Sequence, residues 1–255
     1  PMSYYILPKI NNTININPHH TEEEMYKPVI SLSLYNYYNQ LKNQIDNIFL
    51  DLSFNNYDEI IQIVNPYEYI FSKVPGSKIS VSKLKPQTNI FYDFLEITTS
   101  LNIFEQFKNN PISSLHISPN YNDTIDCLEM LRENFSDEIS YYTELNDNNI
   151  KTIGDTKFDF LFFETKNSQL NEYISSLIEY AMVILRNQNS GGNCVIKISE
   201  IFHKPIVDIL YFLSSLFEKI YILKPTTNNI TTFDKYIICK NFQTNETKIK
   251  NYKLK

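Results

Sequence analysis

The first part of the chain is dominated by stretches in which apolar residues recur at helical spacing. Residues 20 to 50 have an acidic first turn after Thr21, and their pattern predicts one helix, or two helices broken near Pro28. A second helix is expected at 57 to 64, and a third from about 88 to 108. This part of the chain therefore predicts a largely helical extension.

From residue 112 onward, short apolar runs alternate with longer amphipathic segments. The apolar runs predict strands, namely SSLHIS, EISYYTEL, FDFLFF, NCVIKI, KIYIL and KYIICKNF. Amphipathic segments near 122 to 134, 168 to 188 and 204 to 216 predict helices. Such alternation implies crossover connections and a mostly parallel sheet covered on both faces. The last two runs are joined by a polar loop without a helix, so they are expected to pair as an antiparallel hairpin.

Composition adds bounds to this α/β picture. Hydrophobic residues make up 42% of 255 residues and are spread throughout, which favours one compact unit. We expect residues 1–110 to form a helical extension packed on a Rossmann-like core of residues 111–255. The formal net charge of -6 repels phosphate, so any contact with nucleic acid requires a local basic patch or a basic partner.

The positions of the cysteines indicate whether a metal site is expected, and the hydropathy along the chain indicates whether a membrane segment is. Cys127, Cys194 and Cys239 stand singly in apolar stretches, which predicts buried free thiols and no metal site. No apolar run approaches the roughly 18 residues of a membrane span, and no signal peptide is recognised. A cytoplasmic location without membrane contact is expected, with a viral factory or a virion as special cases. The bias toward Asn, Ile, Lys and Tyr is typical of an AT-rich genome.

Several segments carry a resemblance to a known family. Residues 190 to 242 contain, in order, a GG turn, a strand ending in Lys, a helix, a strand ending near KP and a polar loop before a last strand. This segment resembles FtsJ-like and cap RNA 2'-O-methyltransferases. NPYEYI at 65 to 70, NIFYDFLEI at 89 to 97 and KFDFLFFE at 157 to 164 are similar to further segments of that family. The resemblance implies the class I methyltransferase fold, which a terminal hairpin also fits.

The resemblance also implies an active-site tetrad of Lys, Asp, Lys and Glu around the ribose 2'-hydroxyl. The second lysine matches Lys197, the glutamate matches Asp234 and the first carboxylate matches Glu164. The first lysine matches Asp93, which reverses its charge, unless the register slips and Lys85 takes its place. Three acids around one lysine are expected to keep Lys197 protonated.

The family binds S-adenosylmethionine over a glycine-rich turn after the first strand. Here that turn, within LHISPNYNDTIDCLEML, contains no glycine, and Pro119 and Tyr121 would lie where the methionine part of the donor binds. If a donor binds, Ser118, Asn120 and Glu144 are the positions expected to contact it. We therefore expect no cofactor, or S-adenosylmethionine if the chain is active.

These features leave three hypotheses for function. The favoured one is a catalytically inactive FtsJ-like subunit that serves as a scaffold or activator in viral-type mRNA capping or RNA processing, similar to the small subunit of poxvirus-type capping enzymes. The alternatives are an active S-adenosylmethionine-dependent RNA 2'-O-methyltransferase, and a structural or interaction module. The expected partner is a protein of a capping or RNA-processing complex, with a homo-oligomer as the alternative. RNA contact is expected through an ordered loop that carries Lys73, Lys78, Lys83 and Lys85.

Overall fold

The computed structural model describes residues 2–11, 14–15, 27–51, 86–133, 135–166, 169–243 and 249–250. Their helices are α1 (Leu32–Asp51), α4 (Ile90–Ser100), α5 (Tyr121–Leu131), α6 (Asp147–Ile153), α7 (Leu170–Asn187), α8 (Lys204–Leu216) and a 3-10 turn at Glu105–Phe107. Their strands are β1 (Tyr4–Ile6), β2 (Ile14–Asn15), β3 (Ser113–Ile117), β4 (Glu138–Tyr142), β5 (Phe158–Glu164), β6 (Gln188–Ile198), β7 (Phe217–Leu223), β8 (Lys235–Phe242) and β9 (Ile249–Lys250). None of the described helices combines the length and apolar character that crossing a bilayer requires. The helix expected at 57 to 64 and the lysine loop lie outside the described residues.

The main sheet has the strand order β1-β7-β8-β6-β5-β3-β4. Strands β4, β3, β5 and β6 pair in parallel, as the alternation of strands and helices predicts. Strand β8 is antiparallel to both β6 and β7. The pairing of β7 with β8 confirms the expected hairpin, and the mostly parallel sheet confirms the Rossmann-like α/β fold.

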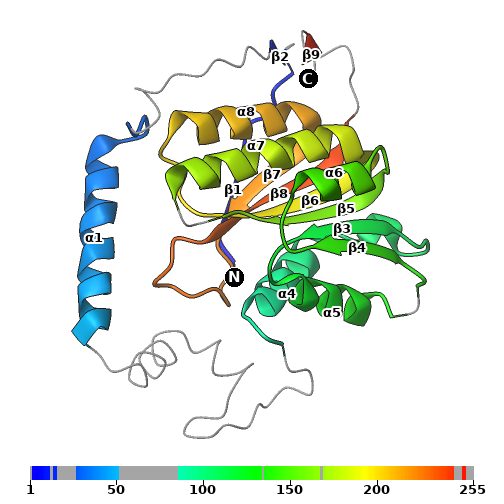
Figure 1. The fold of residues 1–255 in the computed structure, drawn as a ribbon, viewed down its shortest axis with the longest axis horizontal. Coiled ribbons are helices and arrows are strands. Elements are labelled where there is room, and N and C mark those ends of the chain that lie inside the picture. The colour runs from blue at the N-terminus through cyan, green and yellow to red at the C-terminus, as the bar shows by residue number, and fades with distance from the viewer. Residues whose placement is uncertain are drawn as a thin grey trace, which may run out of the picture.

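Strand β5 shows why the sheet is buried on both faces. Its side chains alternate: Phe160 and Phe162 pack with α4 and α5, whereas Leu161 and Phe163 pack with α7 and α8. All four are fully buried. Figure 1 shows the same layers, with α7 and α8 on one side of the sheet and α4 and α5 on the other. Residues 160–163 are thus continuously hydrophobic because this part of the strand has two cores to fill.

The helix expected over 88 to 108 is shorter than predicted. Helix α4 ends at Ser100, and the chain then turns through Asn102, whose φ of 51° lies in the left-handed region. The hydroxyls of Thr98 and Thr99 bond to carbonyls of the preceding turn and compete with helix continuation. The prediction of one continuous helix was therefore wrong at this turn, since a left-handed residue reverses the chain.

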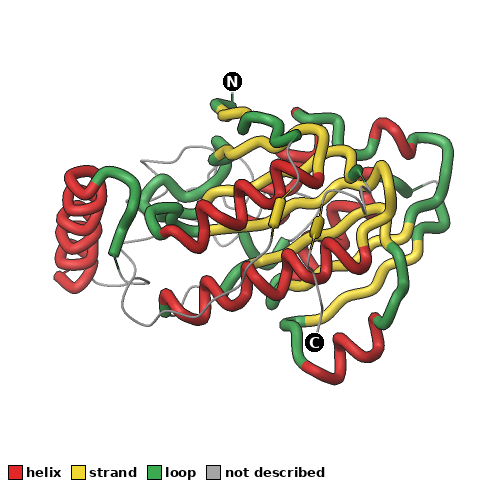
Figure 2. The backbone as a smooth tube through the Cα atoms, turned by 90° about the horizontal axis from the view of Figure 1, so that it is seen from above, coloured by secondary structure: helices red, strands yellow, loops and turns green. Residues whose placement is uncertain are grey.

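Strand β1 and helix α6 are among the elements that were not predicted from the sequence. Strand β1 joins the sheet antiparallel to β7 although its side chains are exposed. Helix α6 begins where the Asn146 side chain accepts a hydrogen bond from the Asn149 N–H at 2.9 Å, and it ends at Gly154 with a φ of 53°. A capping Asn and a terminal Gly are sequence signals of a short helix. Figure 2 shows α1 standing apart from the layered core at one end of the molecule.

A buried ion pair fixes the connection between α5 and β4. The Arg132 guanidinium donates to both carboxylate oxygens of Asp137, at 2.6 and 3.0 Å, and also to the carbonyls of Phe107 and Asn110. The side chains of the pair are only 4% and 7% exposed. The ring of Phe135 lies 4.6 Å from the guanidinium. One arginine thus ties α5 to the turn that follows α4.

We predict that Arg132→Ala lowers the free energy of unfolding by about 3–5 kcal/mol, because it leaves the Asp137 carboxylate buried without its charge partner. Lys108→Ala is the matched control, since Lys108 pairs with Glu105 at an exposed site and its loss should cost less than about 0.5 kcal/mol. Chemical denaturation of both variants measures the difference. Equal losses in the two variants would contradict the role given to Arg132.

Candidate functional site at the carboxyl ends of the strands

Three of the predicted site residues meet at one edge of the sheet. Glu164 ends β5, Lys197 lies directly opposite it in the parallel strand β6, and Asp234 immediately precedes β8. Because β8 runs antiparallel to β6, its beginning lies beside the carboxyl end of β6. The sheet topology alone therefore brings these side chains together, at the edge where parallel α/β sheets place their sites.

Lys197 lies between the two carboxylates. Its Nζ is 3.1 Å from Glu164 Oε1 and 3.3 Å from Asp234 Oδ2, and the lysine side chain is 13% exposed. Burial lowers the pKa of Lys197. The two carboxylates raise it by more than burial lowers it, so the pKa lies above the ordinary 10.5. At neutral pH the ammonium is fully charged, so it cannot accept a proton from a hydroxyl.

The second carboxylate oxygen of Glu164 is bonded to the turn after β3. Ser118 donates its hydroxyl to Oε2 at 2.6 Å, and the Asn120 amide donates to the same oxygen at 3.1 Å. The Ser118 hydroxyl oxygen also accepts the Asn120 main-chain N–H at 2.9 Å. Two of the three residues expected to contact a methyl donor, Ser118 and Asn120, therefore point toward Glu164.

Aromatic packing holds the far side of this turn. The rings of Tyr121, at the start of α5, and Tyr141, on β4, stack with centroids 4.5 Å apart and an interplanar angle of 25°. Pro119 is exposed, while Ser118 is fully buried. Tyr121 thus packs on the edge strand β4 rather than on the Lys197 cluster.

Glu144 pairs with a residue outside the Lys197 cluster. It is exposed, and its carboxylate pairs with Lys166 at 3.0 Å. This pairing raises the pKa of Lys166, mainly through the hydrogen bond that Lys166 donates to Glu144. Glu144 therefore connects the segment after β4 with the segment after β5.

Asp93 lies on α4 and is 1% exposed. Its carboxylate accepts hydrogen bonds from Thr227, Asn228 and Tyr236, but it makes no ion pair with Lys197. Burial raises the pKa of Asp93 to about 6, against the opposing effect of these hydrogen bonds and of the Lys197 charge. Of the four tetrad positions, three meet at Lys197 and the fourth belongs to a neighbouring network. Lys73, Lys78, Lys83 and Lys85 lie outside the described residues.

Helix α1 packs on the two loops that flank the cluster. The Tyr38 ring lies 3.8 Å from the Phe233 ring, centroid to centroid, and Tyr35 packs edge-on against Phe202 at 5.3 Å. Burial raises the pKa of Tyr38 to about 12, with further contributions from Glu200 and other acidic groups. Tyr35 and Tyr38 of α1 therefore cover the loop that contains Phe202 and the loop that leads to Asp234.

Two lysines at this edge were missed in the sequence. Lys224 donates to Asn228 Oδ1 at 2.6 Å and to the carbonyls of Thr232 and Asp234, both at 2.9 Å. Lys235 donates to the carbonyls of Ser199 and Phe233. Burial lowers the pKa of each to about 8. A lysine at the end of a buried strand was the available signal, since its ammonium must find acceptors there.

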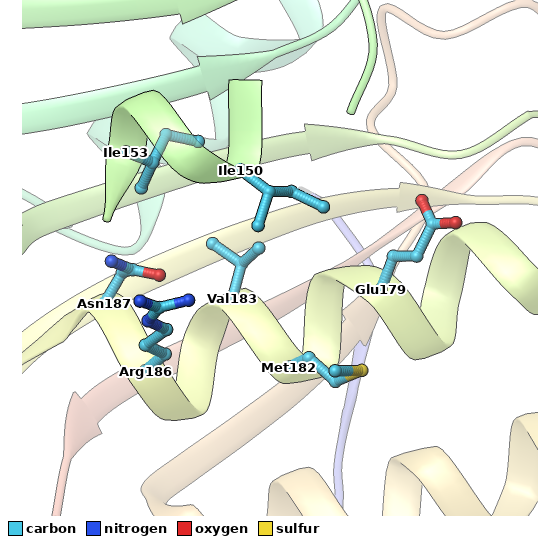
Figure 3. A pocket seen from close by; sticks show the side chains of 7 residues that line it. All are labelled: Ile150, Ile153, Glu179, Met182, Val183, Arg186 and Asn187. Carbon is cyan, nitrogen blue, oxygen red and sulfur yellow. The ribbon is translucent and has the colours of Figure 1, made fainter. Parts of the chain in front are cut away.

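A separate cavity lies away from these residues. It has a volume of about 90 Å³ and is lined mainly by apolar side chains such as Ile150, Ile153, Met182 and Val183. Figure 3 shows these side chains between α6 and α7. None of the predicted site residues lines it. The predicted site residues that the structure describes thus lie away from this cavity.

A segment of this chain is similar in sequence to a known protein. Cap-specific mRNA (nucleoside-2'-O-)-methyltransferase 2 of Drosophila melanogaster is 38% identical over 58 residues, which make up 23% of this chain and 8% of that protein. The chain therefore matches only a small part of the length of this relative. No family model matches the chain.

Solved structures give a coarser likeness. A ribosomal RNA methyltransferase of Plasmodium falciparum has a TM-score of 0.45 and 14% identity, covering 61% of this chain and 98% of that one. An rRNA methylase of Streptococcus thermophilus has a TM-score of 0.37 and 12% identity, covering 58% and 97%. The fold assignment rests on the strand order and the terminal hairpin described above. Over 58 residues the chain is similar in sequence to a cap 2'-O-methyltransferase, as its motifs predict, and its strand order is that of a Rossmann-like α/β sheet.

Proposed function

We propose that this chain is a methyltransferase-fold subunit of an RNA-processing assembly that transfers no methyl group itself and acts by binding a protein partner. The observation that carries this proposal is the inward orientation of the turn after β3. Ser118 and Asn120, which would have to contact a methyl donor, both donate to Glu164. The hydrogens that these two side chains donate to Glu164 are thus used within the protein.

The methyl donor does not fit the residues present at this turn. Donor binding would require the chain to approach the ligand closely, which glycine permits and larger residues hinder. The segment from Ser118 to Tyr121 contains no glycine. Opening it would break two charge-assisted hydrogen bonds to Glu164, each worth about 1.5–3 kcal/mol, and would leave that acid bonded to Lys197 alone.

The acceptor side supports the same proposal. General base catalysis at neutral pH works best with a group whose pKa lies near 7. The pKa of Lys197 is instead raised above 10.5 by the two acids that face it. The position that the resemblance gives to the first lysine of the tetrad holds Asp93, which is buried in another network. Lys197 is thus held in its protonated form and does not supply a base for a ribose hydroxyl.

Most long basic side chains at the sheet edges serve the fold. Lys9, Lys224, Lys235 and Lys240 all donate to main-chain carbonyls. Ammonium groups used in this way are withdrawn from phosphate contacts. This favours a protein partner over direct RNA capture by the described residues.

A second candidate is an active RNA 2'-O-methyltransferase with an unusual donor turn. The observation that favours it is the proximity of Lys197, Glu164 and Asp234, which matches three positions of the family tetrad. In that case Lys197 would orient the ribose oxygen as a charged hydrogen-bond donor.

Isothermal calorimetry of the purified chain with S-adenosylmethionine separates the two candidates. We expect no saturable heat, because the turn after β3 is closed on Glu164. An active methyltransferase with proven donor affinity is the positive control. A dissociation constant in the micromolar range would contradict the proposal.

A methyl-transfer assay on capped RNA tests the second candidate. We expect no transfer from the chain alone. Transfer that Lys197→Met abolishes, while the exposed control Lys204→Met retains it, would establish the second candidate in place of the first. Transfer that survives Lys197→Met would rule out both accounts of this lysine. Circular dichroism of each variant confirms folding.

A further inference from the structure

The loop of residues 224–234, between β7 and β8, is folded around a lysine at its own start. The Lys224 ammonium bonds to Asn228 and to the carbonyls of Thr232 and Asp234. Since the loop has no helix or strand, these bonds supply the internal order that secondary structure would otherwise provide. They close the loop but do not fix its position on the core.

Two acids of α4, one helical turn apart, supply that position. Glu96 accepts from the Thr226 hydroxyl at 2.6 Å and from the Thr227 N–H at 3.1 Å. Asp93 accepts from the Thr227 hydroxyl at 2.9 Å and from the Asn228 amide at 2.6 Å. The bonds to Asp93 are buried, so water does not compete for them.

The end of this loop is part of the Lys197 cluster. Asp234 closes the loop, and its carboxylate lies 3.3 Å from Lys197 Nζ. A displacement of the loop by an ångström would lengthen this contact and weaken the charge pairing. The anchor on α4 and the ion pair at β6 are therefore two ends of one short, ordered segment.

We propose that Asp93 is a positioning residue, which anchors loop 224–234 through Thr227 and Asn228 and thereby holds the Asp234 carboxylate at Lys197. The position where the resemblance implies a lysine thus carries an acid with a different task. This role does not depend on whether the chain transfers methyl groups. Its test therefore measures the pKa of Lys197 and not a catalytic rate.

Other charges near Asp93 offer a competing explanation. Glu96 lies on the same helix, Lys197 and Lys224 come from β6 and the end of β7, and Tyr236 on β8 donates its hydroxyl to Asp93 at 2.9 Å. The negative charge of Asp93 also favours the protonated form of Lys197 directly, through space. A test must therefore change the anchor without changing any charge.

Thr227→Val meets this requirement, because it removes the hydroxyl that bonds to both acids and keeps every charge. Thr231→Val is the matched control: it lies in the same loop, and its hydroxyl bonds only to Asn229 of that loop. The readout is the pKa of Lys197, followed by NMR of its labelled Cε and assigned with Lys197→Arg. We expect the pKa of Lys197 to fall by roughly 0.5 to 1 unit in Thr227→Val, because an opposite charge retreats, and to stay unchanged in Thr231→Val.

A double-mutant cycle separates positioning from direct electrostatics. Asp93→Ala should lower the pKa of Lys197 in the otherwise unchanged chain, and this effect should become much smaller when Asp234→Asn is already present, because only the direct interaction between the two charges then remains. A full effect of Asp93→Ala in the Asp234→Asn background would overturn the proposal in favour of direct electrostatics. Equal pKa values of Lys197 in Thr227→Val and Thr231→Val would overturn it as well. That comparison stands even if Asp93→Ala fails to fold.

Discussion

The edge of the sheet depends on one buried charge, the Lys197 ammonium between the Glu164 and Asp234 carboxylates. A lysine withdrawn from water is tolerated only where opposite charges and acceptors surround it. Each acid comes from a different segment, so this single cation joins the ends of β5 and β6 to the loop before β8. The loss of either acid would leave charge poorly compensated. The segments that carry the acids are accordingly held in place, Glu164 by Ser118 and Asn120 and the loop by α4.

The same pairing that stabilises this edge leaves little capacity for chemistry there. A methyltransferase of this fold needs an open turn for its donor and polar groups free to orient the acceptor. Here the polar side chains of the turn and the strand ends are bonded to one another, and the cation has two anions at hand. These contacts support the proposal that the fold has been kept for binding a partner while its former site has become part of the framework.

The sequence predicted the framework better than the contacts. Mostly apolar runs such as FDFLFF predicted the strands, and the polar loop before KYIICKNF predicted their hairpin, because periodicity and burial are local signals. The meeting of Glu164, Lys197 and Asp234 followed from the family resemblance and is present in the structure. The contacts of Asp93 could not be predicted, since they depend on how α4 packs against a loop more than a hundred residues away. The turn of Ser118 and Asn120 toward Glu164 is likewise a matter of side-chain orientation, which spacing along the chain does not determine.

The pKa of Lys197 in the unmodified chain tests this account most directly. A lysine that acts as a base needs a pKa well below its usual value, whereas a lysine that neutralises two carboxylates needs the opposite. Direct titration of the labelled side chain by NMR gives the value. The account predicts a pKa above the ordinary 10.5. A pKa of Lys197 near 8 would contradict it and would favour an active methyltransferase site instead.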